Sequence, residues 1–208
     1  MNFLGIDTTG KQALIVAQIN GKKYYDEVIN EKHSEALLKH IDDILLKAKV
    51  ELKDIDVFGN VSGPGSFTGI RIGLSTIKAF AYALNKKVVN VTRFDVLSSL
   101  VHGYVVLECT KSSVYYAKIA DDVVDYGVSD LIDLHKVIPT SATVNILAEE
   151  HFVLPDAYKK VVTIQNYKES VLPYMLYKLG RNESFTSNEI SPFYIQVSQA
   201  ERNLKEIK

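Results

Sequence analysis

Apolar runs near the N-terminus are separated by turn residues, and this pattern predicts three strands followed by a helix. Residues 2–7 form a short apolar run typical of a buried strand. An Asn-Gly pair, a strong hairpin signal, separates two further runs at residues 13–19 and 22–28. Apolar residues then recur at helical spacing over residues 34–48. The order is therefore three antiparallel strands and an amphipathic helix.

The most distinctive stretch is residues 62–73, which read Ser-Gly-Pro-Gly-Ser-Phe-Thr-Gly-Ile-Arg-Ile-Gly. The first four residues predict a turn, and Ser66 or Thr68 is suited to cap a long helix after it. Gly69 and Gly73 lie four residues apart and therefore on one helical face. Because each glycine costs a helix roughly 1 kcal/mol relative to alanine, the pair indicates a face that another backbone approaches closely.

The remaining pattern predicts a second unit with a similar order of elements. A strand is expected at 57–61, before the distinctive stretch. The later elements are strands at 88–91, 104–109, 114–119, 123–128 and 143–148, helices at about 94–100, 130–137 and 170–179, and a polar tail or covering segment at 181–208. We therefore expect two halves, residues 1–100 and residues 101–208, related by element order and not by visible sequence repetition.

The motif of residues 62–73, with Asp7-Thr8-Thr9 and His33-Ser34-Glu35 ahead of it, is similar to the TsaB (YeaZ) family. The likeness covers residues 1–95. It implies an α/β, duplicated actin-like (ASKHA) fold with two βββαβα-type halves. It also implies a non-catalytic subunit that pairs with TsaD and works with TsaE. That complex supports threonylcarbamoyl transfer to the tRNA adenosine next to the anticodon.

The same resemblance implies a pairing surface on the glycine-containing helix and on the helix at 34–48. The residues expected in this partner interface are Leu37, Ile41, Ile44, Gly65, Gly69, Arg71, Gly73 and Thr76. No cofactor is obligatory, but ATP or ADP is a candidate ligand near the partner boundary. The tRNA is expected to bind only through the complex, and the sequence leaves open whether the isolated chain is a monomer or a homodimer.

Asp7, Thr8 and Thr9 are the candidate cofactor-binding residues, because actin-like ATPases place their first phosphate loop between two hairpin strands. Backbone amides and hydroxyls in such a turn hold a phosphate or a magnesium-bound water. The alternative is a polar turn whose Asp and Thr side chains bond their own backbone. Both interpretations stay open from the sequence.

No metal site and no catalytic residue are predicted. His33 and His40 are seven residues apart, about 10 Å along a helix, whereas a helical metal pair needs a spacing of four. The catalytic TsaD relatives carry a His-x-x-x-His pair that is missing here. Cys109 lies in an apolar run and is expected to be a core thiol.

Two arginines that TsaB chains usually show are also missing. Glu108-Cys109-Thr110-Lys111 stands in place of an Asp-Ala-Arg-like segment, and Gln196 stands where a Pro-x-Tyr-Leu-Arg motif ends. Two rival functions remain: an actin-like phosphotransferase that uses Asp7, and a metallopeptidase-like protein. The absence of a second glycine-rich loop argues against the first, and the absence of the histidine pair argues against the second.

Composition limits the choice of partners. The 208 residues are 47% hydrophobic and 24% charged, which is ordinary for a globular protein. The net charge of −1 gives no overall attraction to polyphosphate, so strong tRNA binding by the chain alone is not expected. A single cysteine suits a reducing compartment. With no signal-peptide pattern or membrane-length apolar run, the expected location is the cytoplasm.

Overall fold

The computed structural model describes residues 1–29, 31–148 and 152–196, and for residue 33 it describes the backbone alone. These residues form two compact units. Unit 1 contains Met1–Val96 and Lys168–Phe193, and unit 2 contains Leu97–Tyr167 together with residues 194–196. The expected division at residue 100 differs from this one, because the segment from Lys168 to Phe193 returns to unit 1.

Unit 1 is built on a mixed five-stranded sheet with the order β3-β2-β1-β4-β5. Its strands are β1 (Phe3–Asp7), β2 (Ala13–Ile19), β3 (Lys22–Val28), β4 (Val57–Val61) and β5 (Lys87–Val91). The first three strands pair antiparallel, whereas β1, β4 and β5 run parallel. The hairpin predicted from the Asn-Gly pair is confirmed, with both of its strands at the expected bounds.

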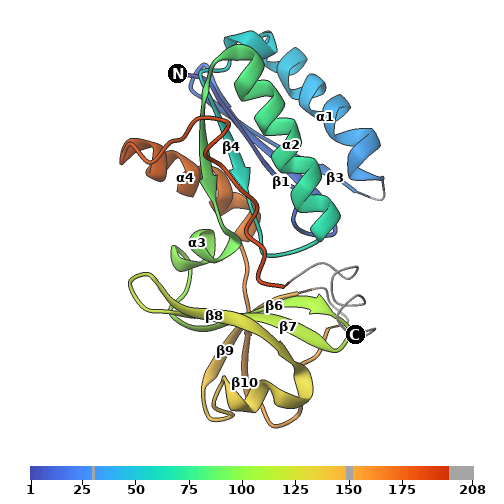
Figure 1. The fold of residues 1–208 in the computed structure, drawn as a ribbon, viewed down its shortest axis with the longest axis vertical. Coiled ribbons are helices and arrows are strands. Elements are labelled where there is room, and N and C mark those ends of the chain that lie inside the picture. The colour runs from blue at the N-terminus through green and yellow to red at the C-terminus, as the bar shows by residue number, and fades with distance from the viewer. Residues whose placement is uncertain (30, 149–151, 197–208) are drawn as a thin grey trace, which may run out of the picture. The chain divides into compact units, whose positions relative to one another are not determined.

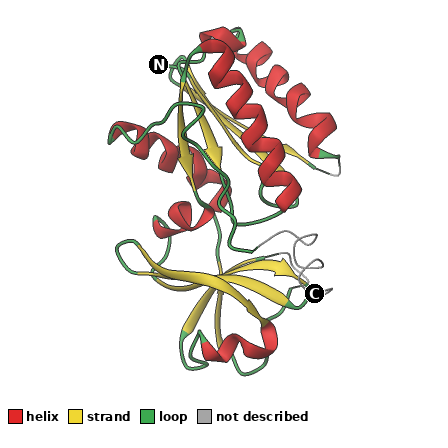
Figure 2. Ribbon diagram, in the orientation of Figure 1, coloured by secondary structure: helices red, strands yellow, loops and turns green. Residues whose placement is uncertain are grey.

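Helices cover both faces of this sheet. On one face lie α1 (His33–Ala48) and α2 (Phe67–Leu84), side by side (Figure 1). The core between them and the sheet includes Leu4, Ile15, Leu37, Ile41, Ile44, Phe58 and Ile77. A short 3-10 helix, Leu52–Asp54, precedes β4, and α3 (Arg93–Ser98) follows β5. Figure 2 shows the strands of unit 1 running between the helices.

The helix α4 (Tyr167–Gly180) packs on the opposite face through a hole made by two glycines. Gly5 of β1 and Gly59 of β4 are paired in register across the parallel strands. A β-carbon at Gly5 would lie 2.8 Å from Met175 Sδ, and one at Gly59 would lie 2.6 Å from the same atom. Met175 is completely buried. This knob-into-hole contact explains why α4 belongs to unit 1.

Unit 2 repeats the strand order of unit 1. Its strands are β6 (Gly103–Thr110), β7 (Ser113–Ile119), β8 (Val123–Asp130), β9 (Thr143–Leu147) and β10 (Lys160–Thr163). They form a sheet in the order β10-β9-β6-β7-β8, in which the first strand of the unit is again central and the next two strands along the chain lie to one side of it. The predicted duplicated α/β architecture is confirmed by this match.

Several details of the second half differ from the prediction. Residues 131–136 form a 3-10 helix in place of the helix expected at 130–137. The strand β10 was not predicted, and within the described residues no helix joins β9 to β10, so this half lacks the full βββαβα order. No helix in the described part of the chain is long and apolar enough to cross a membrane.

Of the two alternatives expected for the polar segment at 181–208, a tail or a covering segment, its described part is a covering segment, because it lies along the free edge of β5. Phe185 exchanges two backbone hydrogen bonds with Val88, at 2.8 and 2.9 Å. Ile190 is buried in the core of unit 1. The Phe193 amide donates to the Ser62 carbonyl oxygen at 2.9 Å. The last part of the predicted tail, residues 197–208, lies outside the described residues.

Candidate functional site

The Asp-Thr-Thr turn between β1 and β2 is closed by its own side chains. The Thr9 amide donates to Asp7 Oδ1 at 2.9 Å, and the Thr9 hydroxyl donates to the same oxygen at 2.5 Å. Asp7, Thr8 and Thr9 are all buried. An Asp side chain that accepts from the amide two residues later is the local bonding expected of a structural turn.

The beginning of α2 is attached directly to this turn. Ser66 caps the helix by accepting from the Gly69 amide at 3.2 Å, as predicted. The Ser66 amide in turn donates to the Thr9 carbonyl oxygen at 2.7 Å. The Thr8 hydroxyl donates to the Gly69 carbonyl oxygen, also at 2.7 Å. Two hydrogen bonds therefore join the turn to the first turn of the helix.

The three glycines allow this attachment. A β-carbon at Gly65 would overlap the Thr9 carbonyl oxygen, and one at Gly69 would overlap the Thr8 carbonyl oxygen. At Gly73 a β-carbon would overlap the Thr8 hydroxyl. The inferred close approach of a second backbone is thus present, but that backbone belongs to this chain. The interface role expected of the three glycines is corrected to an internal contact.

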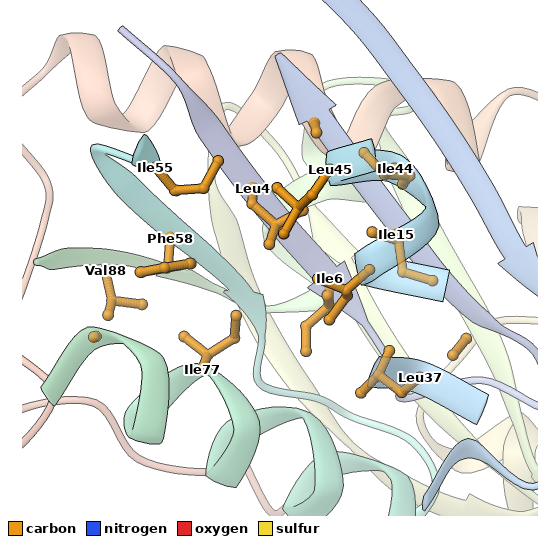
Figure 3. Close-up of a cluster of buried hydrophobic side chains, with 14 of the residues drawn as sticks. Leu4, Ile6, Ile15, Leu37, Ile44, Leu45, Ile55, Phe58, Ile77 and Val88 are labelled. Atoms are coloured by element: carbon orange, nitrogen blue, oxygen red, sulfur yellow. The ribbon is translucent and has the colours of Figure 1, made fainter. Parts of the chain in front are cut away.

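The apolar residues expected in the partner interface also lie inside unit 1. Leu37, Ile41 and Ile44 are each at most 2% exposed and belong to the core beneath α1. Figure 3 shows Leu37 and Ile44 among the other core side chains of the sheet. Because a helix buries its most regularly spaced apolar residues against its own sheet, these side chains leave no surface for a partner.

The outward sides of the same two helices carry some of the exposed apolar residues of the chain. On α1, Leu38 is 53% exposed and Leu46 is 73% exposed, and on α2 Tyr82 is 76% exposed. Ser75 and Ala79 are also exposed, one helical turn apart on α2. Small residues between larger exposed ones permit close approach from outside. We call these five residues, together with Arg71, the outer face.

The other two predicted interface residues are placed differently from each other. Arg71 is exposed, and its guanidinium lies 4.0 Å from the centre of the Phe67 ring. Thr76 is half-buried and donates its hydroxyl hydrogen to the Ile72 carbonyl oxygen at 2.9 Å. Leu46 and Tyr82 are exposed apolar residues that the sequence analysis did not single out. Each is an apolar residue that lies outside the regularly spaced apolar positions of its helix. A search for the regular spacing alone therefore overlooks both residues.

A phosphate at the Asp-Thr-Thr turn would compete with bonds that are already made. The Thr9 amide and hydroxyl both donate to Asp7, and the Thr8 hydroxyl donates to Gly69. Amides and hydroxyls of this kind are among the groups that bind a phosphate. Nucleotide binding by Asp7, Thr8 and Thr9 therefore stays a prediction.

The remaining candidates for chemistry lie apart from the turn. His40 Nδ1 is 2.9 Å from an Asp26 carboxylate oxygen, and its Nε2 is 3.6 Å from one of Glu31. The side chain of His33 lies outside the described part of the structure. Within the described residues, no group of three His, Cys, Asp or Glu side chains is placed to hold a metal ion. Cys109 is partly buried and lies 3.8 Å from Gln196 Oε1.

Comparison with known families and relatives adds the following. A family model described as TsaD: tRNA N6-adenosine threonylcarbamoyltransferase matches residues 25–133. The tRNA threonylcarbamoyladenosine biosynthesis protein TsaB of Haemophilus influenzae is 25% identical over 99 residues, which are 47% of this chain and 42% of that protein. A tRNA N6-adenosine threonylcarbamoyltransferase of Staphylococcus epidermidis is 33% identical over 81 residues, which are 37% of this chain and 24% of that protein. The chain thus spans less than half the length of each.

Solved structures resemble the whole described fold. YeaZ from Pseudomonas aeruginosa matches with a TM-score of 0.70 at 20% identity, covering 93% of this chain and 99% of the other. An uncharacterized protein from the same organism, with similarity to peptidase YEAZ, matches with a TM-score of 0.71 at 19% identity, covering 94% and 99%. These matches show that the chain has the fold of those proteins.

Proposed function

Because this chain belongs to the TsaD family of tRNA N6-adenosine threonylcarbamoyltransferases, we propose that it takes part in making threonylcarbamoyladenosine on tRNA. The observation that carries the proposal is the family match over residues 25–133. The resemblance to TsaB (YeaZ) proteins is confirmed by the Haemophilus relative and by the Pseudomonas fold.

Within that process, this chain acts as a non-catalytic subunit that pairs with a TsaD-type transferase. The hydrogen bonds of its Asp-Thr-Thr turn support this role. The hydroxyls of Thr8 and Thr9 and the Thr9 amide, which could bind a phosphate, are bonded inside the protein. The transferase supplies the reacting groups, and this chain supplies a surface. A transferase activity of the chain itself is the alternative, since several relatives carry that name.

The pairing surface is the outer face of α1 and α2. Leu38, Leu46 and Tyr82 expose large apolar side chains there, although the same helices bury a full apolar stripe on the other side. The side chains of Ser75 and Ala79 on α2 are small and exposed, so a partner helix can approach α2 closely there. Such clusters of exposed apolar and aromatic residues mark interaction sites.

The role of a subunit paired with the transferase also determines how TsaE, tRNA and a nucleotide would bind. TsaE joins through the transferase complex, and tRNA binds to the complex, since the net charge of −1 gives this chain little attraction of its own. ATP or ADP binds near the partner boundary. Calorimetry with ADP tests this, first with the chain alone and then with the transferase present.

The test is a binding measurement against the TsaD-family transferase of the same host. Leu46→Asp and Tyr82→Ala each remove one exposed residue of the outer face, and each should raise the dissociation constant on the order of tenfold or more. Tyr177→Ala is the matched control, because Tyr177 is 56% exposed on α4, which covers the other face of the sheet.

Reconstitution of the modification separates the two roles. With tRNA, TsaE and the AMP ester of threonylcarbamoyl supplied, the chain with the transferase should form threonylcarbamoyladenosine and release AMP, and the chain in place of the transferase should form none. Product from the chain alone would replace the subunit proposal with a transferase. Equal affinities for the wild type, both outer-face variants and the control would remove the outer face from the proposal.

A further inference from the structure

Thr8 is a fully buried polar residue that joins two segments far apart in the sequence. Its exposed fraction is 0%, and its hydroxyl donates to the Gly69 carbonyl oxygen at 2.7 Å. The same hydroxyl lies where a β-carbon at Gly73 would be. One side chain therefore contacts two successive turns of α2 from the inner side.

The neighbours of Thr8 fix its position. Asp7 holds the turn through the amide and the hydroxyl of Thr9, and the Thr9 carbonyl oxygen accepts from the Ser66 amide. Because Gly65 lies against Thr9 without any side chain between them, neither segment can shift without the other. The turn and the start of α2 are thus joined by two hydrogen bonds and by close packing at the glycines.

The outer face of α2 lies on the other side of the same helical turns. Arg71 and Ser75 flank Gly73 and are exposed, whereas Gly73 is buried against Thr8. Because Arg71 and Ser75 are carried by the same helical turns, a change in how Thr8 holds those turns also changes the position or order of these two residues.

We infer that Thr8 is a positioning residue for partner binding: it sets the place of the outer face through α2 and touches no ligand itself. This inference rests on the proposed function, because it assumes that the outer face binds the transferase. The composition of the Asp-Thr-Thr turn also suits a phosphate loop. The inference gives the turn another role, which is to hold the helix that presents the outer face.

The test compares removal of the Thr8 hydroxyl with removal of its methyl group. Thr8→Val keeps the shape and removes the hydroxyl, whereas Thr8→Ser keeps the hydroxyl. With Val, α2 loses one attachment and must be reordered on binding, so the dissociation constant for the transferase should rise on the order of tenfold. Thr8→Ser should restore most of the affinity.

A control separates positioning from general loss of stability. Met175→Ala removes a buried side chain on the other face of the sheet and lowers the thermal midpoint without touching α2. Affinities are measured well below every midpoint, where all variants are folded. Met175→Ala should bind like the wild type. If it weakens binding as much as Thr8→Val does, the effect is one of stability and the inference is overturned.

Amide hydrogen exchange of the isolated chain gives a readout that needs no partner. In Thr8→Val, exchange should quicken over the first two turns of α2 more than over the rest of unit 1. In Thr8→Ser and Met175→Ala, any faster exchange should be spread over unit 1 and not concentrated in those two turns. Unchanged exchange in Thr8→Val overturns the positioning role. Faster exchange with unchanged affinity overturns its link to binding. A wild-type chain without affinity for the transferase overturns the proposed function, and the exchange data then decide the role of Thr8 in α2.

Discussion

The Thr8 hydroxyl donates a 2.7 Å hydrogen bond to the Gly69 carbonyl oxygen, across 61 residues of sequence. The Asp-Thr-Thr turn and the glycine-containing helix are therefore two halves of one contact. Glycine is required because each added β-carbon on α2 would meet this turn. The glycines of residues 65–73, which the sequence analysis assigned to a partner interface, thus make a contact inside the chain. The proposed binding surface is on the outward side of the same helix.

A side chain at Gly73 should destabilise the folded chain. In Gly73→Ala the new β-carbon overlaps the Thr8 hydroxyl, and such overpacking costs about 1–3 kcal/mol. The gain in helix propensity is at most about 1 kcal/mol, so the net effect is a lower thermal midpoint. Gly180→Ala is the matched control, since a β-carbon at Gly180, in the last turn of α4, meets no atom within 4 Å. A Gly73→Ala midpoint at or above that of wild type would contradict the contact.

Gly59 and Met175 should compensate each other. Gly59→Ala places a β-carbon 2.6 Å from Met175 Sδ and should cost about 1–3 kcal/mol. Met175→Ala empties a buried site and should cost about 2–5 kcal/mol. In the double variant the new methyl occupies part of the space that the sulfur leaves, so its loss should be smaller than the sum.

Chemical denaturation of the four proteins measures this coupling. The rescue should be partial, because a β-carbon at Gly59 also lies 2.6 Å from the Phe3 ring. Strictly additive losses would mean that α4 does not pack into the glycine hole.

Local patterns predicted the elements of unit 1 because each signal there is short-range. The Asn-Gly turn and the alternating residues around it define β2 and β3 to the residue. The strand β10 gave no such signal, since all four of its residues are exposed and only two are apolar. The return of α4 to unit 1 depends on Gly5 and Gly59 lying side by side, which only the sheet brings about.

The candidate site shows the same limit. The sequence revealed that α2 is approached closely, but not which backbone approaches it. Thr8 and Thr9 lie more than fifty residues before Gly65, and an Asp-Thr-Thr turn suits a phosphate as well as a helix. Leu37 and Ile44 were assigned to a partner because helical spacing identifies a buried face without saying what buries it.

Unit 2 should lose stability at alkaline pH through Tyr158. Burial raises the pKa of the Tyr158 phenol above its ordinary value of 10.0, and its hydroxyl donates to the Ile138 carbonyl oxygen at 2.9 Å. A pKa that is higher in the folded state means that stability is fully present below pH 10 and is lost as the pH rises through the folded pKa. Urea midpoints at pH 8 and at pH 10.5 should differ more for the wild type than for Tyr158→Phe. Equal differences in the two proteins would show that this phenol does not contribute.

Ala79 offers a sharp contrast with Gly73, because both lie on α2 but Gly73 is buried and Ala79 is exposed. Ala79 is exposed, and leucine is nearly as good a helix former as alanine, so Ala79→Leu should leave the thermal midpoint unchanged. On the outer face, however, the added side chain stands where a partner helix would approach. Overpacking of about 1–3 kcal/mol there corresponds to about 5- to 150-fold weaker binding of the transferase.

The same substitution at Ala157, which is exposed in unit 2, is the control and should leave affinity unchanged. Gly73→Ala and Ala79→Leu then separate the two faces of one helix, since the first should change folding and the second should change binding. Binding that is insensitive to Ala79→Leu, with the midpoint preserved, would place the transferase elsewhere on the chain. A lowered midpoint in Ala79→Leu would instead mean that this side of α2 is covered by the protein itself.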